Sequence, residues 1–160
     1  MTIQVGDPIP EAVLSYIDNG VHRIDTHTLF NGRKLVLFAV PGAFTPTCSE
    51  RHLPGFIAHF EEFHARGIVV ACMAVNDPFV MQAWGEQQQV PKNLRMLSDG
   101  NADFTRALGL EMDASGYGMG VRSKRFALYA EAGIVRGLWV EAPGEFRVSS
   151  AEHVLANLPD

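Results

Sequence analysis

The chain has 160 residues, of which 47% are hydrophobic and 19% are charged, a composition that excludes a disordered or low-complexity protein. Lys and Arg number 13 against 18 Asp and Glu, so the formal net charge is −5, and no basic run occurs. We therefore expect neither nucleic acid nor an anionic membrane surface as a partner. The length fits a single domain spanning residues 1–160.

Targeting signals and disulfides are not indicated. Residues 1–10, MTIQVGDPIP, carry neither the positive charges nor the apolar segment of a secretory leader. The longest apolar runs, 35–40 and 68–75, are far shorter than the ~20 residues that span a bilayer. Two cysteines, Cys48 and Cys72, are too few for a secreted disulfide framework. The expected compartment is the cytoplasm, where a cysteine stays reduced unless its chemistry is used.

The first elements in chain order are β-structure followed by a helix. Residues 12–24 hold two β-rich runs around Asn19-Gly20, which predicts a β-hairpin. The unbroken apolar run 34–40 predicts a buried strand that ends before Pro41. Apolar residues then recur at helical spacing from 46 to 66, which predicts one helix, kinked where Pro54 interrupts its hydrogen bonds.

The second half continues the alternation. Residues 68–75 predict another buried strand, and Asp77-Pro78 is typical of the start of a helix, which we expect to run to about Gln88. The remaining elements are short: a strand at 94–97, a helix at 102–108, a hairpin formed by 125–130 and 134–140, and a last helix opened by the capping box Ser149-Ser-Ala-Glu152.

This order of elements indicates an α/β fold. The strands at 34–40 and 68–75, joined by the helix at 46–66, should form a right-handed parallel βαβ unit. A thioredoxin-like fold with an N-terminal β-hairpin extension accommodates every element. A flavodoxin-like fold is the alternative, but it would need a parallel strand where 125–140 indicates a hairpin.

Cys48 is the main candidate for chemistry. It follows a buried strand and lies in the first turn of the predicted helix, where unpaired N–H groups and the helix dipole favour a thiolate. A cysteine free in solution, with a pKa near ~8.5, would be mostly unreactive at neutral pH. The alternative is a buried structural cysteine, but the polar, turn-rich surroundings TPTCSE argue against it.

Three neighbours could serve the same site. The hydroxyl of Thr45, three residues earlier, could hold a substrate O–H or O–O group, or it could cap the helix. Pro41 could shield a thiolate from water or merely end the strand. A guanidinium from the cluster of Arg122, Lys124 and Arg125 would stabilise a thiolate and a negative transition state, although a solvated turn is the alternative.

Other patterns are weaker. His52, four residues after Cys48, raises a Cys–His hydrolase or a metal pair, but two ligands do not make a zinc site, and the six histidines more often occupy surface or core-edge positions. No phosphate-binding loop occurs, and the glycines at 116, 118 and 120 do not follow a strand. We therefore expect no metal and no cofactor. Cys72 lies in a strand that is apolar on both faces and is interpreted as a core residue, with a resolving thiol for Cys48 as the alternative.

The segment PGAFTPTC, residues 41–48, resembles the active-site motif P-x-x-x-T-x-x-C of peroxiredoxins. The longer run 41–56 and the runs 75–85, 97–110 and 120–128 resemble the type II, or type five, subgroup of that family, so the resemblance extends over nearly the whole chain. It implies a thioredoxin-like fold, a thiol-dependent peroxidase acting on hydrogen peroxide and alkyl hydroperoxides, and a homodimer. Phe44 and Phe79 are large apolar residues, each in a loop or a helix start near the active site, and they could lie at its interface.

Position by position, the resemblance implies roles for four residues. Cys48 matches the peroxidatic cysteine, Thr45 the active-site threonine, Pro41 the shielding proline and Arg125 the arginine of the pocket, for which Arg122 is less well placed. His52 also matches a family position, but the family mechanism does not use it as a base.

The chain departs from some members of the subgroup in one respect. Those members carry a third cysteine near the C-terminus, whereas residues 144–150 here read GEFRVSS. Recycling must use Cys72 or an external thiol, and the resemblance implies glutaredoxin with glutathione, or thioredoxin. Because a thiol in a buried strand is costly to expose, we predict that Cys72 is not required. A redox-dependent chaperone or signalling module without efficient turnover is the alternative function.

Overall fold

The computed structural model describes residues 2–159. The strands in this range are β1 (Val13–Ile17), β2 (Val21–Asp25), β3 (Lys34–Val40), β4 (Ile68–Ala74), β5 (Arg95–Ser98), β6 (Glu111–Asp113), β7 (Val121–Ser123), β8 (Phe126–Glu131) and β9 (Ile134–Val140). The α-helices are α1 (Thr26–Phe30), α2 (Leu53–Ala58), α3 (Phe60–Ala65), α4 (Pro78–Gln87), α5 (Asp103–Leu108) and α6 (Ala151–Asn157). A single π-helical turn, η1, spans Cys48–His52, and a 3₁₀ turn, η2, spans Ser115–Tyr117.

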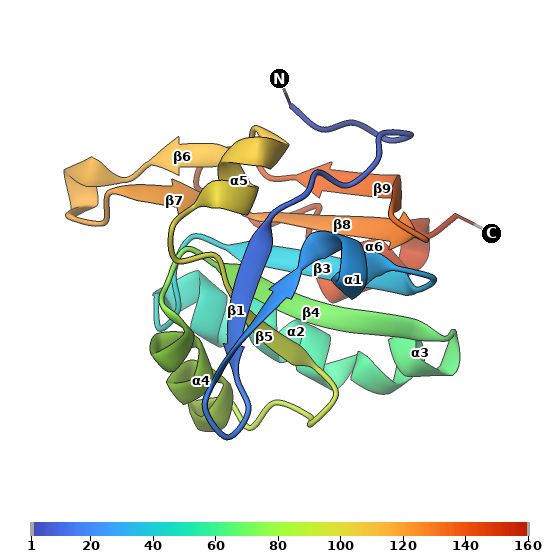
Figure 1. The fold of residues 1–160 in the computed structure, drawn as a ribbon, viewed down its shortest axis with the longest axis horizontal. Coiled ribbons are helices and arrows are strands. Elements are labelled where there is room, and N and C mark those ends of the chain that lie inside the picture. Colours follow the sequence, from blue (N-terminus) through green and yellow to red (C-terminus); the bar gives the residue numbers. More distant parts are fainter. Residues whose placement is uncertain (1, 160) are drawn as a thin grey trace.

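Seven strands form one twisted sheet in the order β2-β1-β5-β4-β3-β8-β9 (Figure 1). The three central strands, β5, β4 and β3, are parallel, while β1 and the hairpin β8–β9 run antiparallel on either side. The predicted parallel βαβ unit is therefore confirmed, and the hairpin β8–β9 excludes the flavodoxin-like alternative. The β1–β2 hairpin extends one edge of the sheet, as expected for the thioredoxin-like arrangement.

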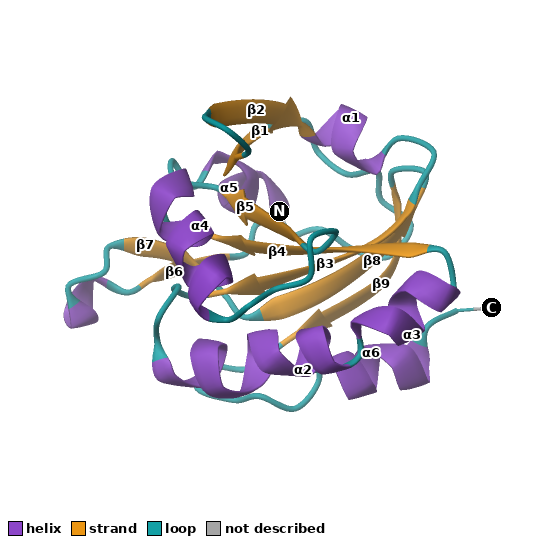
Figure 2. Ribbon diagram, turned by 90° about the horizontal axis from the view of Figure 1, so that it is seen from below, coloured by secondary structure: helices purple, strands orange, loops and turns teal. Residues whose placement is uncertain are grey.

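The two faces of the sheet bury separate hydrophobic layers. Along β3, Val36, Phe38 and Val40 contribute to one layer, and the alternate residues contribute to the other, as the two-residue period of a strand requires. The layer with Phe38 also contains residues of α2, α3, α4 and α6, and the second layer contains residues of α1 and α5. Figure 2 shows α2, α3 and α6 together below the sheet and α1 and α5 on its other side.

The segment predicted as one helix from 46 to 66 is interrupted twice, which corrects that prediction. The chain first makes the π turn η1, in which the Leu53 N–H donates to the Cys48 carbonyl. Pro54 follows directly, in a backbone that stays helical through His52 and Leu53. The proline predicted to interrupt the helical hydrogen bonds therefore coincides with a π turn, which accommodates a residue without an N–H, and not with an end of the helix. A second break falls at His59, whose φ of −102° and ψ of 10° separate α2 from α3.

The cap of the last helix is shifted by one residue from the predicted box. The Ser150 side chain, not that of Ser149, accepts the hydrogen bond from the His153 N–H. Asp77 does cap α4 as predicted, since its carboxylate accepts from the Val80 N–H at 2.8 Å. Sequence reasoning missed α1 and the small β6–β7 hairpin, which projects from the main sheet in Figure 1.

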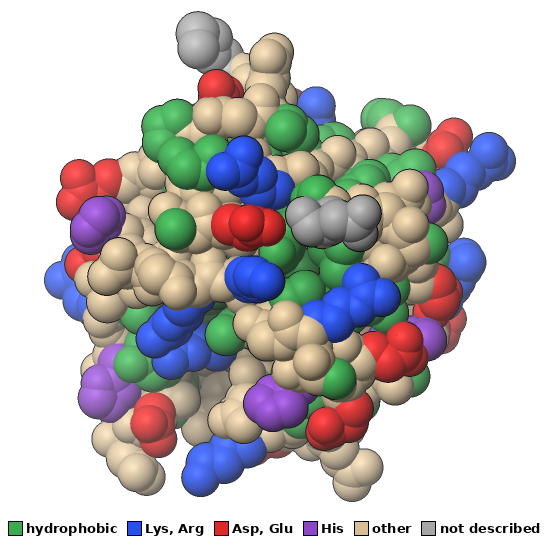
Figure 3. All heavy atoms as spheres, turned by 90° about the vertical axis from the view of Figure 1, so that its right-hand side faces the viewer, with side chains coloured by type: hydrophobic (Ala, Val, Ile, Leu, Met, Phe, Trp, Pro, Cys, Tyr) green, Lys and Arg blue, Asp and Glu red, His purple; other side chains and the backbone are tan. Residues whose placement is uncertain are grey.

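The surface shows no charge segregation on the face drawn in Figure 3, where acidic and basic side chains are interspersed with apolar and polar ones. Among residues 2–159, no helix has the length and apolar character needed to cross a membrane.

Candidate active site

Cys48 lies where the connection after β3 enters η1, and its side chain is fully buried. The loop before it is held by the segment that follows β4, because the Asn76 side chain accepts a hydrogen bond from the Ala43 N–H at 2.9 Å. The next residue, Ser49, is held from α4, since its hydroxyl accepts from the indole N–H of Trp84 at 2.9 Å. The carboxyl end of β3 therefore presents Cys48 in a fixed, water-excluded position, as expected for a reactive group in an open α/β sheet.

Arg125, the residue before β8, brings its guanidinium to the Cys48 thiol. Its Nη2 lies 3.1 Å from Cys48 Sγ, and its Nη1 lies 2.9 Å from Nδ1 of His52. The two branches of one planar fork therefore contact two residues of η1. Among residues 2–159, no carboxylate forms an ion pair with Arg125, so its positive charge is available to a thiolate and to a bound anion.

The other two cations of the predicted cluster do not contact Cys48. Arg122, in β7, donates from Nε to the Met119 carbonyl at 2.9 Å and from Nη1 to the Pro41 carbonyl at 3.4 Å. Lys124 is exposed. The structure thus separates the three residues into one beside the thiol, one supporting the Pro41 loop and one in solvent.

Thr45 and Pro41 lie in the loop that leads into η1, and both are half-buried. The Thr45 hydroxyl donates to the Gly42 carbonyl at 2.6 Å, and the Thr45 carbonyl accepts from the Ser49 N–H at 2.9 Å, so Thr45 begins the helical segment through its backbone. Because that hydroxyl proton is already committed, the oxygen is left as an acceptor for a substrate O–H. The loop passes close to Met119 and Arg122, which would crowd any side chain larger than hydrogen at Gly42.

His52 is fully buried, so the expectation that the histidines occupy the surface or the core edge is wrong for this residue. Its ring packs against Phe38 and Phe146. Nε2 lies 2.9 Å from the Ser149 carbonyl, which can only accept, so this nitrogen carries the proton and Nδ1 accepts from Arg125. Both ring nitrogens are occupied and neither faces Cys48, which rules against the Cys–His hydrolase reading.

Burial and the adjacent Arg125 charge lower the pKa of His52 to about 3, from a usual value of 6.5. The neutral imidazole therefore bridges Arg125 to the loop after β9 without competing with the thiolate for its charge. A carboxylate in the same position would have neutralised the guanidinium.

This neutral, buried histidine predicts an acid-sensitive fold. Between pH 6.5 and about pH 3 the unfolded chain binds a proton at His52 that the folded chain excludes, so stability rises with pH across this window. The His52 contribution to the unfolding free energy should fall by about 2 kcal/mol between pH 7 and pH 5. Urea unfolding at both pH values should show this loss in the wild type and in the exposed control His27→Asn, and a clearly smaller loss in His52→Asn. An equal loss in all three proteins would contradict the assignment.

Cys72 is also fully buried, in β4, opposite Phe38 of β3. It belongs to the same hydrophobic layer as Cys48, and neither cysteine is in a disulfide. Burial raises the pKa of the Cys72 thiol well above its usual value, and the nearby Cys48 adds to this. Cys72 is therefore held as a protonated core residue in the structure.

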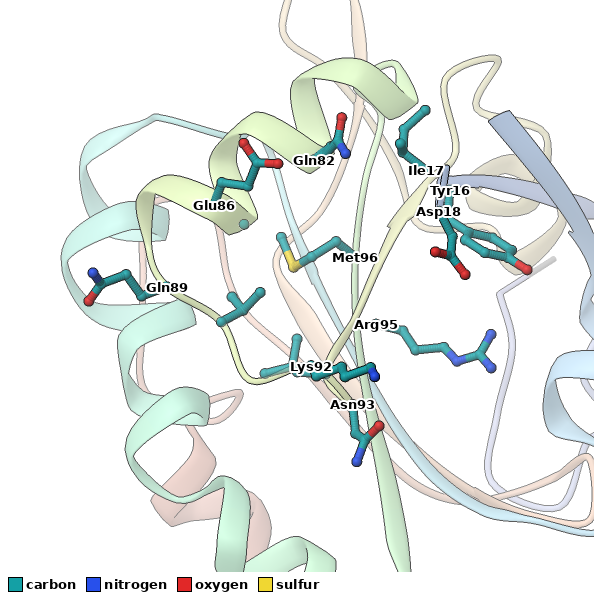
Figure 4. Close-up of a pocket in the computed structure, with 13 residues that line it drawn as sticks. Tyr16, Ile17, Asp18, Gln82, Glu86, Gln89, Lys92, Asn93, Arg95 and Met96 are labelled. Carbon is teal, nitrogen blue, oxygen red and sulfur yellow. The ribbon is translucent and has the colours of Figure 1, made fainter. Parts of the chain in front are cut away.

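One surface pocket lies away from Cys48. A pocket of about 480 Å³ between the β1–β2 hairpin, α4 and the start of β5 is lined by Tyr16, Gln82, Glu86 and Arg95 among others (Figure 4). The pocket lies toward the amino end of β5, whereas Cys48 follows the carboxyl end of the parallel strand β3. The two are therefore at opposite ends of the parallel strands. Within residues 2–159, no group of three or more His, Cys, Asp or Glu side chains is arranged to hold a metal ion.

Two residues near the site were missed by sequence reasoning. Glu141, directly after β9, is buried and accepts hydrogen bonds from the backbone and side chain of Ser149. The Ser149 carbonyl in turn holds His52. The pattern Ser149-x-x-Glu152 looked like a helix cap, and that local interpretation concealed a contact to a residue eight positions away.

The sequence and the fold both match known proteins. The model of the redoxin family matches residues 4–155. Peroxiredoxin-2E-2, chloroplastic, of Oryza sativa subsp. japonica is 53% identical, with 98% of this chain and 73% of that protein covered. Peroxiredoxin-2D of Arabidopsis thaliana is 46% identical, with 98% of each covered. The crystal structure of reduced Prx3 in complex with H₂O₂ from Vibrio vulnificus is 50% identical, covers 97% of this chain and 98% of that one, and superposes with a TM-score of 0.93.

The cytoplasmic location expected from the sequence is contradicted by these comparisons. The rice relative and Peroxiredoxin-2E of Arabidopsis thaliana, 46% identical, are chloroplastic. Composition and a low cysteine count indicate at most a reducing compartment, and they do not separate the cytoplasm from a plastid. The identities and the coverage nevertheless settle the family: this chain is a redoxin and, within that family, a type II peroxiredoxin, a thiol-dependent peroxidase.

Proposed function

We propose that the chain reduces hydrogen peroxide and alkyl hydroperoxides through a sulfenic acid formed at Cys48. The observation that carries the proposal is the contact of 3.1 Å between Arg125 Nη2 and Cys48 Sγ inside a site that excludes water. A cation at that distance favours the thiolate, which is the nucleophilic form of cysteine. The relative solved in complex with H₂O₂ supports peroxide as the substrate.

In the first step the Cys48 thiolate attacks one oxygen of the peroxide, a sulfur–oxygen bond forms, and the oxygen–oxygen bond breaks. The departing oxygen takes the bonding electron pair and a proton from solvent, and it leaves as water or an alcohol. Cys48 is thereby oxidised to a sulfenic acid.

Two residues of the loop and Arg125, directly before β8, support this step in the proposal. Arg125 stabilises the negative charge that spreads from sulfur onto the two oxygens. The Thr45 oxygen accepts the peroxide O–H, since its own proton is given to the Gly42 carbonyl at 2.6 Å. Pro41 covers the site with an apolar ring and limits hydration of the thiolate.

Recycling in this proposal uses an external thiol. A thiol condenses with the sulfenic acid, releasing water and leaving a mixed disulfide on Cys48, and a second thiol displaces the thiolate. Two observations support an external thiol over Cys72: Cys72 is fully buried in β4, and burial raises the pKa of its thiol, so it is a poor nucleophile. We propose glutathione with glutaredoxin as the reductant, with thioredoxin as the alternative.

Cys72→Ala should therefore retain peroxide turnover within about twofold of the wild type when glutathione and glutaredoxin are supplied. The physical reason is that the mixed disulfide forms and resolves at Cys48 alone. Steady-state peroxide consumption, assayed separately with glutathione plus glutaredoxin and with thioredoxin, measures this directly. Loss of turnover in Cys72→Ala, together with an internal Cys48–Cys72 disulfide in the peroxide-treated wild type by mass spectrometry, would make Cys72 the resolving thiol. Stoichiometric consumption without turnover under either system would instead favour the redox-dependent chaperone or signalling function.

We also propose that the protein is a homodimer. Phe44 lies in the active-site loop and Phe79 in the first turn of α4, and they are 50% and 63% exposed. Phe44 has a φ of 64°, which a bulky residue adopts only under constraint, and an exposed aromatic ring held this way suits an interface. Sedimentation of the reduced protein at micromolar concentrations should give the mass of two chains. A single-chain mass across that range would overturn the proposal.

A further inference from the structure

We propose that Glu141 is a positioning residue for the peroxidase reaction, which acts through Ser149 and His52 to fix the guanidinium of Arg125 against Cys48. The inference rests on the proposed role of Arg125. Under this proposal a buried carboxylate outside the loop 41–48 helps to set the geometry around the reacting thiol.

The Glu141 carboxylate ties together the turn that follows β9. Its oxygens accept from the backbone N–H groups of Arg147, Val148 and Ser149 and from the Ser149 hydroxyl, at 2.7 to 2.9 Å. The side chain is 6% exposed, and a carboxylate is buried this deeply only where its charge is met. Burial alone would raise the pKa of Glu141, but the hydrogen bonds from Ser149, Arg147 and Val148 outweigh it and hold the pKa below its usual value. The four donors therefore absorb the negative charge locally.

The turn held by Glu141 contacts the active site through the Ser149 carbonyl. The Ser149 carbonyl accepts from Nε2 of His52 at 2.9 Å, which fixes the tautomer and the plane of that ring. Nδ1 of His52 then accepts from Nη1 of Arg125 at 2.9 Å, and the other branch of the fork reaches Cys48. The chain of contacts from Glu141 to Cys48 has no step longer than 3.1 Å.

The same residue also holds the backbone of Arg125. The Glu141 N–H donates to the Arg125 carbonyl at 2.9 Å, which extends the β8–β9 ladder by one bond. Glu141 thus fixes Arg125 at its carbonyl directly and at its guanidinium through Ser149 and His52, and the contacts form a closed ring. A ring restrains a long, flexible side chain far more than one contact does, because every member must move for the guanidinium to move.

The arrangement positions Arg125 without cancelling its charge. The Glu141 carboxylate is hydrogen-bonded to three backbone amides and a hydroxyl, and the neutral imidazole of His52 separates it from the guanidinium. Phe146, in the loop that Glu141 closes, packs over His52 at 5.1 Å between ring centroids and lies 5.9 Å from the Arg125 guanidinium carbon. Loss of the anchor would therefore loosen both the bridge and its apolar cover.

The test is a double-mutant cycle on the rate of the first peroxide step. The rate is read by tryptophan fluorescence, since Trp84 contacts the residue after Cys48. Glu141→Gln should slow the step about 10-fold, because a misplacement of about 1 Å in a catalytic group is enough for losses of up to 10². It should also shift the pH profile of Cys48 alkylation upward, since the thiolate loses part of its fixed cation. In an Arg125→Ala background, Glu141→Gln should have no further effect on the rate.

Controls separate positioning from folding. Glu145→Gln, an exposed residue of the same loop, should leave the rate and the profile unchanged. If Glu141→Gln is unfolded at the assay temperature, Ser149→Ala takes its place in the cycle, because it removes one donor to Glu141 and keeps the carbonyl that holds His52; it should slow the step about threefold. Equal slowing with and without Arg125, or no slowing in the folded variant, overturns the inference. If Arg125→Ala itself has no effect, the proposed function of the site fails instead.

Discussion

Cys48→Ser is expected to lower peroxide turnover by on the order of 10⁴-fold or more, to below detection, while the protein remains folded. Serine carries a hydroxyl that is not ionised at neutral pH, so the attacking anion is lost rather than weakened. The smaller side chain fits the site occupied by Cys48, which is fully buried beside Phe38 and Arg125. A hydroxyl can also accept the hydrogen bond from Arg125 Nη2, so no buried donor is orphaned.

The measurement is hydrogen peroxide consumption with glutathione and glutaredoxin in excess, alongside circular dichroism and urea unfolding of the same preparation. Cys72→Ala is the matched control, since it removes the other thiol of the same hydrophobic layer. Its turnover should stay near that of the wild type, and only the Cys48 variant should lose the burst of peroxide consumption. More than trace turnover by a folded Cys48→Ser would move the peroxidatic function to another group.

The fold was predictable because its signals are local and agree with one another. The apolar runs of β3 and β4 and the helical spacing between them leave few arrangements other than a parallel unit. The Asp77-Pro78 start of α4 is confirmed for the same reason, since cap and first turn are adjacent in sequence. The break at His59 has no such signal: no proline or glycine marks it, and it depends on packing over the sheet.

The site was only partly predictable, and the division follows sequence distance. Cys48, Thr45 and Pro41 are found from one short segment that follows a strand. Arg125 could be named from the resemblance, but the cluster it belongs to gave no physical reason to prefer it over Arg122. The register of β8 against β3 makes that choice, because it directs one arginine at η1 and leaves the other to support the Pro41 carbonyl.

Glu141 and Ser149 could not be found, because their roles depend on a turn that closes over His52 from the far end of the chain. A buried glutamate and a serine that does not cap its helix are visible only when the hydrogen-bond partners are known. His52 was misjudged for a related reason: it was placed with the surface or core-edge histidines, because nothing in the sequence shows that the π turn directs its ring into the core and toward Arg125.

Arg125→Ala is expected to slow the first peroxide step by roughly 10²- to 10³-fold, the usual cost of removing one preorganised donor to developing negative charge. The guanidinium is the one cation within hydrogen-bond distance of Cys48 Sγ in residues 2–159, so its loss removes charge stabilisation from the thiolate and from the transition state together. The pH profile of Cys48 alkylation should therefore move upward in the same variant. His52 Nδ1 also loses its donor, which leaves a buried acceptor unpaired.

Two further variants make the result specific to the guanidinium. Arg125→Lys keeps the charge but cannot contact Cys48 and His52 with one planar fork. We therefore expect its first peroxide step to be about 10-fold slower than that of the wild type, and faster than that of Arg125→Ala. Arg122→Ala removes a cation of the same cluster whose guanidinium faces the Pro41 and Met119 carbonyls, so its effect on the rate should be several-fold at most. Rapid mixing with hydrogen peroxide, read by tryptophan fluorescence, ranks the four proteins. Two outcomes would contradict the expectation: Arg122→Ala slows the first peroxide step as much as Arg125→Ala does, or the pH profile of alkylation of Arg125→Ala does not move. In either case the thiolate is stabilised by the helix start and the loop as a whole, and not by a single guanidinium held 3.1 Å from the sulfur.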